Sequence, residues 1–249
     1  DELQAEMGMA LLFITHDLNM VRRFTHRVGV MERGRLVEMG DTAAVFANPQ
    51  HAYTRKLLAS RPQRVVQPVP ADAPVLLQGS DVGVSFEFRE GFFGKRQFHA
   101  VKKATLALKR GETLGIVGES GSGKTTLGMA LLALQGLSAG SVQLAGERID
   151  NASRQALRAM RRRMQVVFQD PFASLNPRMT VGQIVGEGLA LHRPELSAGE
   201  RERMVLAMLD EVGLSERGGV ANVLQRYPHE FSGGQRQRIA IARAVVLRP

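Results

Sequence analysis

The stretch "GESGSGKTT", residues 118–126, follows the pattern G-x-x-x-x-G-K-[ST]. The apolar run "TLGIVG" (113–118) precedes it, and a helical pattern, "LGMALLALQGL" (127–137), follows it. Glycines in such a strand-to-helix turn let backbone N–H groups surround a phosphate at close range. Lys124 adds a positive charge for the β- and γ-phosphates, and the Thr125 hydroxyl can take a place on Mg²⁺. The sequence therefore predicts a nucleotide-binding loop.

Composition narrows the class of protein and of site. The chain has 249 residues, of which 44% are hydrophobic, enough for a packed core. It has no Cys, which excludes disulfides and thiolate metal sites, and its six His show no metal-ligand spacing. We therefore expect any metal ion to be bound together with a ligand and not by protein side chains alone. The longest apolar run, about "MALLFI" (9–14), is too short to span a bilayer.

The net charge of +9 is compatible with a nucleic-acid or anionic-membrane partner. Much of this charge comes from five arginines at near-helical spacing, with no aromatic residues between them. A solvated helix face is therefore the favoured interpretation of Arg154, Arg158, Arg161, Arg162 and Arg163.

Hydrophobic patterns divide the chain into two parts. Before residue 61 they predict an initial helix, a strand at 9–15, a helix at 18–28, a strand at 29–40 and a helix at 52–60. Four prolines in "RPQRVVQPVPADAP" (61–74) then indicate an extended linker. The second part has predicted strands at 76–88, 101–118, 141–149 and 164–170. Residues 181–213 and 235–249 are predicted to be mostly helical.

Two further motifs identify a family. The segments "VVFQDPFASLNPR" (166–178) and "YPHEFSGGQRQRIAIARA" (227–244), together with the phosphate loop, resemble ABC-type ATPases. The sequences and order of these motifs are most similar to those of the peptide, nickel and glutathione importer ATPases. Within that group they most resemble the microcin C and peptide uptake type, which fuses two ATPase domains. The resemblance implies an α/β P-loop NTPase fold of ABC type, with a RecA-like core, an antiparallel β subdomain and a helical subdomain, truncated at both ends.

The same resemblance assigns roles to individual residues. Gln169 matches the Q-loop glutamine, which the resemblance implies to be a catalytic residue. Gln169 and Thr125 would also bind Mg²⁺. The motif "FSGGQ", which begins at Phe231, matches the signature. The implied nucleotide contacts are Gly118, Glu119, Ser120, Gly121, Ser122, Gly123, Lys124, Thr125, Thr126, Ser232, Gly233, Gly234 and Gln235.

The segment "ITHDL" (14–18) resembles the H-loop, in which His16 would be the catalytic switch histidine. In the family this motif comes late in a domain, and residues 30–40 and 48–58 resemble the tail that follows it, although Ala52 stands where relatives usually have proline. We therefore expect 1–60 to be the C-terminal part of a first ATPase domain. Residues 61–74 would be a linker, and 75–249 the N-terminal part of a second domain, from phosphate loop to signature.

ATP hydrolysis in this family also uses an Asp-Glu pair at the end of a strand. Asp210 and Glu211 imitate it, but they precede the signature and lie in an amphipathic helical pattern ending near Gly213. Asp1 and Glu2 have no strand before them. We expect the fragment alone to bind Mg-ATP without turnover, since each composite site of the head-to-tail dimer would lack a part.

The resemblance implies an ATP-hydrolysing subunit, with ATP and Mg²⁺ as cofactors, of a bacterial importer of peptides or related small solutes. It would sit peripherally on the cytoplasmic face of the inner membrane. Its partners would be the permease subunits, which would meet residues 171–188, the other ATPase half and, indirectly, a solute-binding protein, with no nucleic acid. The alternative is a soluble ABC-type ATPase that acts on nucleic acid or ribosomes. The aromatic residue stacking on adenine would be Phe93 or Phe98.

Overall fold

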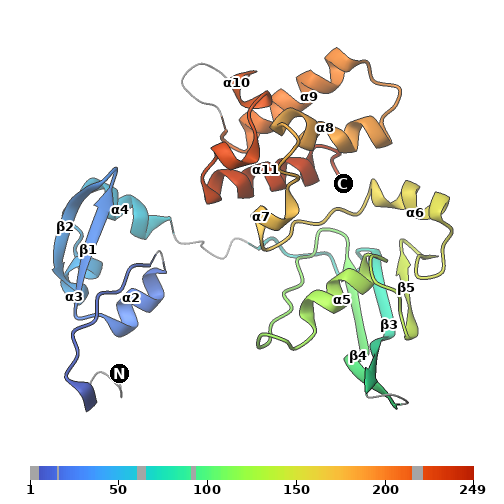
Figure 1. Ribbon diagram of the computed structural model, residues 1–249, viewed down its shortest axis with the longest axis horizontal. Helices are drawn as coiled ribbons and strands as arrows, with labels where there is room; N and C mark the ends of the chain where they lie inside the picture. The colour runs from blue at the N-terminus through green and yellow to red at the C-terminus, as the bar shows by residue number, and fades with distance from the viewer. Residues whose placement is uncertain (1–5, 16, 61–65, 91–93, 215–220) are drawn as a thin grey trace. The chain divides into compact units, whose positions relative to one another are not determined.

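The computed structural model describes residues 6–15, 17–60, 66–90, 94–214 and 221–249. The chain divides into two compact units, 1–68 and 69–249, which are described separately (Figure 1). No helix in the described ranges is long and apolar enough to cross a membrane.

The described part of the first unit contains a β-hairpin and short helices. Its elements are α2 (Leu18–Phe24), β1 (Arg27–Glu32), β2 (Arg35–Asp41), α3 (Thr42–Ala47) and α4 (Ala52–Ala59). The Asp17 carboxylate starts α2 by accepting the N–H of Asn19 at 2.8 Å. Arg33 and Gly34, both at positive φ, turn β1 back onto β2. The predicted strand at 29–40 is therefore a hairpin, and the predicted helix at 18–28 ends early.

Glu38 of β2 fixes the start of α4. Its two carboxylate oxygens accept the N–H groups of Gln50 and His51, at 2.7 and 3.0 Å. The hydroxyl of the buried Thr54 lies near this carboxylate. The Thr54 hydroxyl, followed by these N–H donors, lowers the pKa of Glu38 below its usual range.

The second unit begins with a four-stranded antiparallel sheet in the order β4-β3-β5-β6. The strands are β3 (Val75–Glu90), β4 (Gly94–Lys109), β5 (Ala139–Leu144) and β6 (Glu147–Arg148). Helix α5 (Lys124–Leu131) packs against β3 and β4 (Figure 1). The shared core includes Val82, Val84, Val142 and Ile149, and Leu157 of α6 (Arg154–Arg161) covers it.

The rest of the second unit is helical, with a core of its own. Its elements are α7 (Pro171–Ser174), α8 (Val181–His192), α9 (Ala198–Glu211), α10 (Ala221–Leu224), the 3-10 turn η1 (Pro228–Glu230) and α11 (Gly233–Val245). Capping boxes begin α8, α9 and α11. Asp210 and Glu211 lie in α9, as predicted, and Glu211 pairs with Arg248 at 3.0 Å.

Two predicted strands, at 9–15 and 164–170, and the end of the predicted strand at 101–118 are absent, so these predictions were wrong for the described residues. Segments 9–15, 113–118 and 164–170 are irregular, and they leave Ile14 90% and Val117 93% exposed. A strand forms only where at least one neighbouring strand pairs with its backbone, and these segments pair with no strand in the described ranges. Among the residues that the structure describes, the antiparallel and helical parts of the expected fold are thus formed, whereas a parallel sheet is not.

Candidate nucleotide-binding site

The phosphate loop connects the end of segment 113–118 to the first residue of α5. Gly121 and Gly123 have φ values of +82° and +91°, which favour glycine. A Cβ atom at Gly123 would lie 2.3 Å from the carbonyl oxygen of Ala100 in β4. This close approach fixes the loop against the sheet, and it explains why the second glycine of the motif cannot carry a side chain.

Lys124 closes the loop from within. Its Nζ donates hydrogen bonds to the carbonyl oxygens of Gly118 and Glu119, both at 2.6 Å, and to Ser122 Oγ at 3.2 Å. Because the acceptors span five residues, the ammonium group lies at the centre of the loop's curve. A positive charge and the free N–H groups at the start of α5 therefore meet at one point, as phosphate binding requires.

A cavity of about 510 Å³ adjoins this loop. One wall consists of Gly118 and residues 121–124, and the other of residues 98–102 of β4. Phe98 contributes to the second wall and is 54% exposed, whereas Phe93 lies outside the described residues. The structure thus brings one of the two candidate adenine-stacking residues to the same cavity as the phosphate loop.

His99 also lines this cavity, although sequence reasoning did not single it out. Its Nδ1 lies 2.8 Å from Ser85 Oγ on the neighbouring strand β3. The pairing of Ser85 with His99 across the two strands produces this contact. Only a register for the β3–β4 hairpin could have predicted it.

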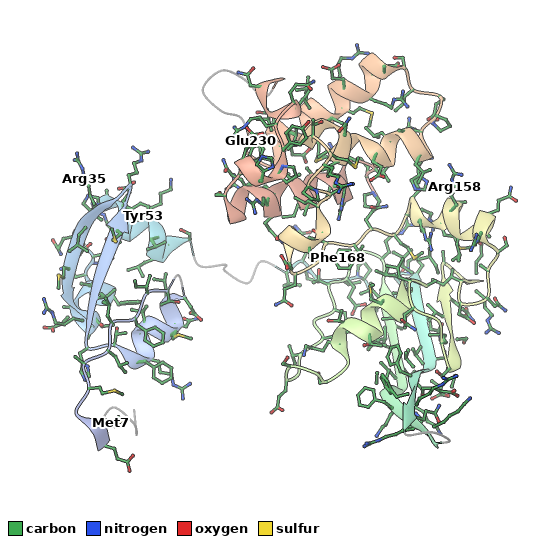
Figure 2. The ribbon with its side chains drawn as sticks, viewed as in Figure 1. Met7, Arg35, Tyr53, Arg158, Phe168 and Glu230 are labelled. Carbon is green, nitrogen blue, oxygen red and sulfur yellow. The ribbon has the colours of Figure 1, made fainter. Side chains whose placement is uncertain are left out.

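Of the two predicted catalytic residues, the structure describes Gln169, which does not line the cavity beside the phosphate loop. Gln169 is exposed and follows Phe168, which Figure 2 labels, in the irregular segment before α7. Arg243 of α11 holds the end of α7 by donating to the carbonyl oxygen of Ser174 at 2.7 Å. His16 lies outside the described residues. In the described ranges, no group of three His, Asp or Glu side chains is arranged to hold a metal ion.

The signature motif forms the start of α11. Ser232 is the N-cap residue, and its Oγ accepts the N–H of Gln235 at 3.4 Å. The Gln235 side chain accepts the N–H of Ser232 at 2.9 Å in return. A Cβ atom at Gly233 or Gly234 would meet nothing within 4 Å. Since packing within the chain does not require these glycines, they leave an open surface at a helix N-terminus.

Two arginines that sequence reasoning did not single out support this start. Arg236 Nε donates to the carbonyl oxygen of Pro228 at 2.7 Å, joining α11 to the turn η1. The guanidinium of Arg226 lies 4.2 Å from the centre of the Phe231 ring and donates to the carbonyl oxygen of Glu230 at 3.0 Å. Figure 2 labels Glu230 in this turn. The motif is therefore held from both sides.

Comparison with known families matches residues 101–249, the part that contains both motifs, to the family described as ABC transporter. The chain belongs to this family. The predicted resemblance to ABC-type ATPases is confirmed.

Curated relatives and solved structures of this ABC family agree. The chain is 50% identical over its whole length to the peptidoglycan transport ATP-binding protein YejF of Agrobacterium fabrum, covering 45% of that protein. It is 42% identical to the glutathione import ATP-binding protein GsiA of Pectobacterium atrosepticum, with 99% of this chain and 43% of that protein covered. The dimeric ABC transporter cassette MJ0796 superposes with a TM-score of 0.60 at 28% identity, over 70% of this chain and 71% of the cassette. The chain thus spans about half the length of the curated relatives it matches.

Proposed function

We propose that this ABC family chain supplies the phosphate loop of one ATP site and the signature of another in the ATP-hydrolysing subunit of a bacterial importer. The observation that carries the proposal is the loop itself, with Lys124 at its centre and the Phe98 cavity beside it. In this assignment the loop holds the β- and γ-phosphates, and Phe98 stacks on the adenine. A solved structure of MJ0796, bound to ADP and Pi, supports nucleotide chemistry for this fold.

Thr125 and Gln169 would bind the magnesium ion that accompanies ATP. A bound Mg²⁺ would neutralise charge that develops on the phosphates. Thr125 is exposed at the start of α5, one residue after Lys124, so its hydroxyl is available beside the loop. Gln169 is exposed as well and has an amide that can bind the ion or orient a water molecule.

We assign residues 1–60 to the end of a first ATPase domain, 61–74 to a linker and 75–249 to the start of a second. The support is the coverage of about half of each curated relative. In a head-to-tail pair of domains, His16 and Ser232 would act at one composite site. Lys124, Thr125 and Gln169 would act at the other.

The substrate class rests on the relatives. Their names specify peptidoglycan transport for YejF and glutathione import for GsiA. We propose that this subunit drives uptake of peptides or related small solutes, with a permease, a second ATPase half and a solute-binding protein as partners. Its place would be the cytoplasmic face of the inner membrane. None of these comparisons favours the alternative of a nucleic-acid or ribosome partner.

The surface proposed to meet the permease is residues 171–188. Leu175 and Val181 anchor this segment in the helical core, whereas Asn176 and Arg178 are exposed between α7 and α8. In the membrane-bound transporter, crosslinkers placed at Asn176 or Arg178 should capture a membrane subunit. Crosslinks only from the arginines of α6 would contradict this assignment.

The adenine assignment is tested by comparing two ligands. Phe98→Ala should weaken ATP binding about tenfold, since stacking of a base on an aromatic ring contributes roughly 1–3 kcal/mol. Binding of inorganic tripolyphosphate, which has no base, should stay unchanged. Phe88→Ala is the matched control, because Phe88 is exposed on the same hairpin but does not line the cavity. Equal weakening of both ligands by Phe98→Ala would refute the stacking role.

A further inference from the structure

Helix α6 presents a row of arginines to solvent. Arg154, Arg158 and Arg162 follow each other at intervals of four residues, and all are exposed, as is Arg161. Leu157 lies on the same face of α6 as Arg154, Arg158 and Arg161, and it packs at the edge of the sheet core together with Met160. Like charges four residues apart destabilise a helix. Within the described part of the chain, no carboxylate forms an ion pair with Arg154, Arg158 or Arg161.

These arginines border a second cavity, of about 340 Å³, at the C-terminal end of α8. Figure 2 labels Arg158 on α6, at the edge of this cavity. The lining combines cations with two leucines and a histidine, namely Arg154, Leu157, Arg158, Arg161, Leu191 and His192. Neither the phosphate loop nor the signature contributes to it.

Three of the six residues that line the cavity are arginines, and they place positive charge beside His192. Burial, followed by the positive charges of Arg158 and Arg162, lowers the pKa of His192 below its ordinary value. The nearby carboxylate of Glu195 already pairs with Arg193, and Arg162 contributes to lowering its pKa. An anion that entered the cavity would offset the repulsion among the arginines and favour the protonated imidazole.

We propose that this cavity is a second ligand site, which binds a small organic anion that carries an apolar group. Guanidinium groups of Arg154, Arg158 and Arg161 would bind its oxyanions, because their N–H donors match phosphate, sulfonate and carboxylate geometry. Leu157 and Leu191 would contact its apolar part. The concave shape favours a small ligand over a flat anionic membrane surface.

The proposal can be tested by calorimetric titration with benzene-1,3-disulfonate, an apolar ring whose two negative charges do not change between pH 6 and 8. The titration uses the Lys124→Ala variant, so that the phosphate loop does not contribute. Arg158→Gln and Arg161→Gln should each weaken binding about tenfold or more, as expected for a lost charge-assisted hydrogen bond. Arg203→Gln, the same change on the exposed face of α9, should have no effect.

His192 provides an independent readout. Since the anion raises its pKa on binding, affinity should increase as the pH falls from 8 to 6, and His192→Gln should abolish this dependence. Equal weakening by Arg203→Gln, or a pH dependence that persists in His192→Gln, would overturn the proposal. So would binding to phosphatidylglycerol vesicles, sensitive to Arg158→Gln, without binding of the disulfonate, because that result would assign the arginines to a membrane surface.

Discussion

Lys124 Nζ lies 2.6 Å from the carbonyl oxygen of Gly118, six residues earlier in the chain. This hydrogen bond joins the two ends of the phosphate loop. The loop's own carbonyl groups thus hold the lysine's charge where phosphate oxygens would be bound. A phosphate would replace these carbonyl contacts with stronger, charge-assisted ones.

Substitution of Gly123 should disrupt the loop. Gly123→Ala would place a Cβ atom 2.3 Å from the Ala100 carbonyl oxygen, at a φ of +91° that non-glycine residues avoid. We expect a loss of at least about 1–2 kcal/mol in stability, from the left-handed conformation alone, and loss of nucleotide binding. Thermal unfolding and ATP titration would measure the two effects.

Gly128→Ala is the matched control for that change. Gly128 lies in α5, where an added Cβ would meet nothing within 4 Å. Alanine is favoured over glycine in a helix by roughly 1 kcal/mol, so this variant should be as stable as the parent or more so, with unchanged ATP affinity. If both variants behaved alike, the contact between the loop and β4 would not be important.

The signature glycines should be dispensable for folding. Gly233 and Gly234 lie in α11 at positions where an added Cβ would meet nothing within 4 Å. Gly233→Ala and Gly234→Ala should therefore each raise the free energy of unfolding by roughly 0.5–1 kcal/mol. In the assembled transporter the same changes should reduce ATP turnover, because the added methyl groups would obstruct the surface that we propose to face the nucleotide. Destabilisation of the isolated chain by either variant would show that the glycines serve packing instead.

Acid should weaken the attachment of α4 to β2 through Glu38. The pKa of this carboxyl is lowered in the folded chain, so its contribution is fully present above the unfolded value of about 4.5 and is lost as pH falls through the lower folded value. Protection factors of the amides in α4, which compare measured with intrinsic exchange rates at each pH, should therefore fall below about pH 4.5. Glu38→Gln should show lower protection factors in α4 already at pH 7, with little further change in acid.

The sequence predicted the elements that depend on local contacts. The helices α4 and α9 and the strands of the β3–β4 hairpin follow from caps, turns and nearby apolar residues. The same reasoning excluded Asp210 and Glu211 as a strand-end pair, and α9 contains both. Family motifs located the phosphate loop and the signature. No local pattern could reveal that Arg236 donates to the carbonyl oxygen of Pro228, or that the Ala100 carbonyl leaves no room for a side chain at Gly123.

The errors concern segments whose structure depends on distant partners. Residues 113–118 and 164–170 have the composition of buried strands, yet a strand forms only where another strand accepts its hydrogen bonds. The hairpin turn at Arg33 and Gly34 was missed for a different reason. Its arginine has a positive φ, which is rare for that residue type, so the turn was less evident than one with asparagine.

Equilibrium binding of Mg-ATP to the chain and to two lysine variants would show whether the loop around Lys124 binds the phosphates of ATP. Lys124→Ala should lose at least about tenfold in affinity, because it removes a charge-assisted contact at the centre of the loop. Lys95→Ala, which removes an exposed lysine paired with Glu87 on the β3–β4 hairpin, should bind as the parent does. If Lys124→Ala and the parent bound Mg-ATP with equal affinity, the nucleotide would not be held by this loop and the account would be wrong.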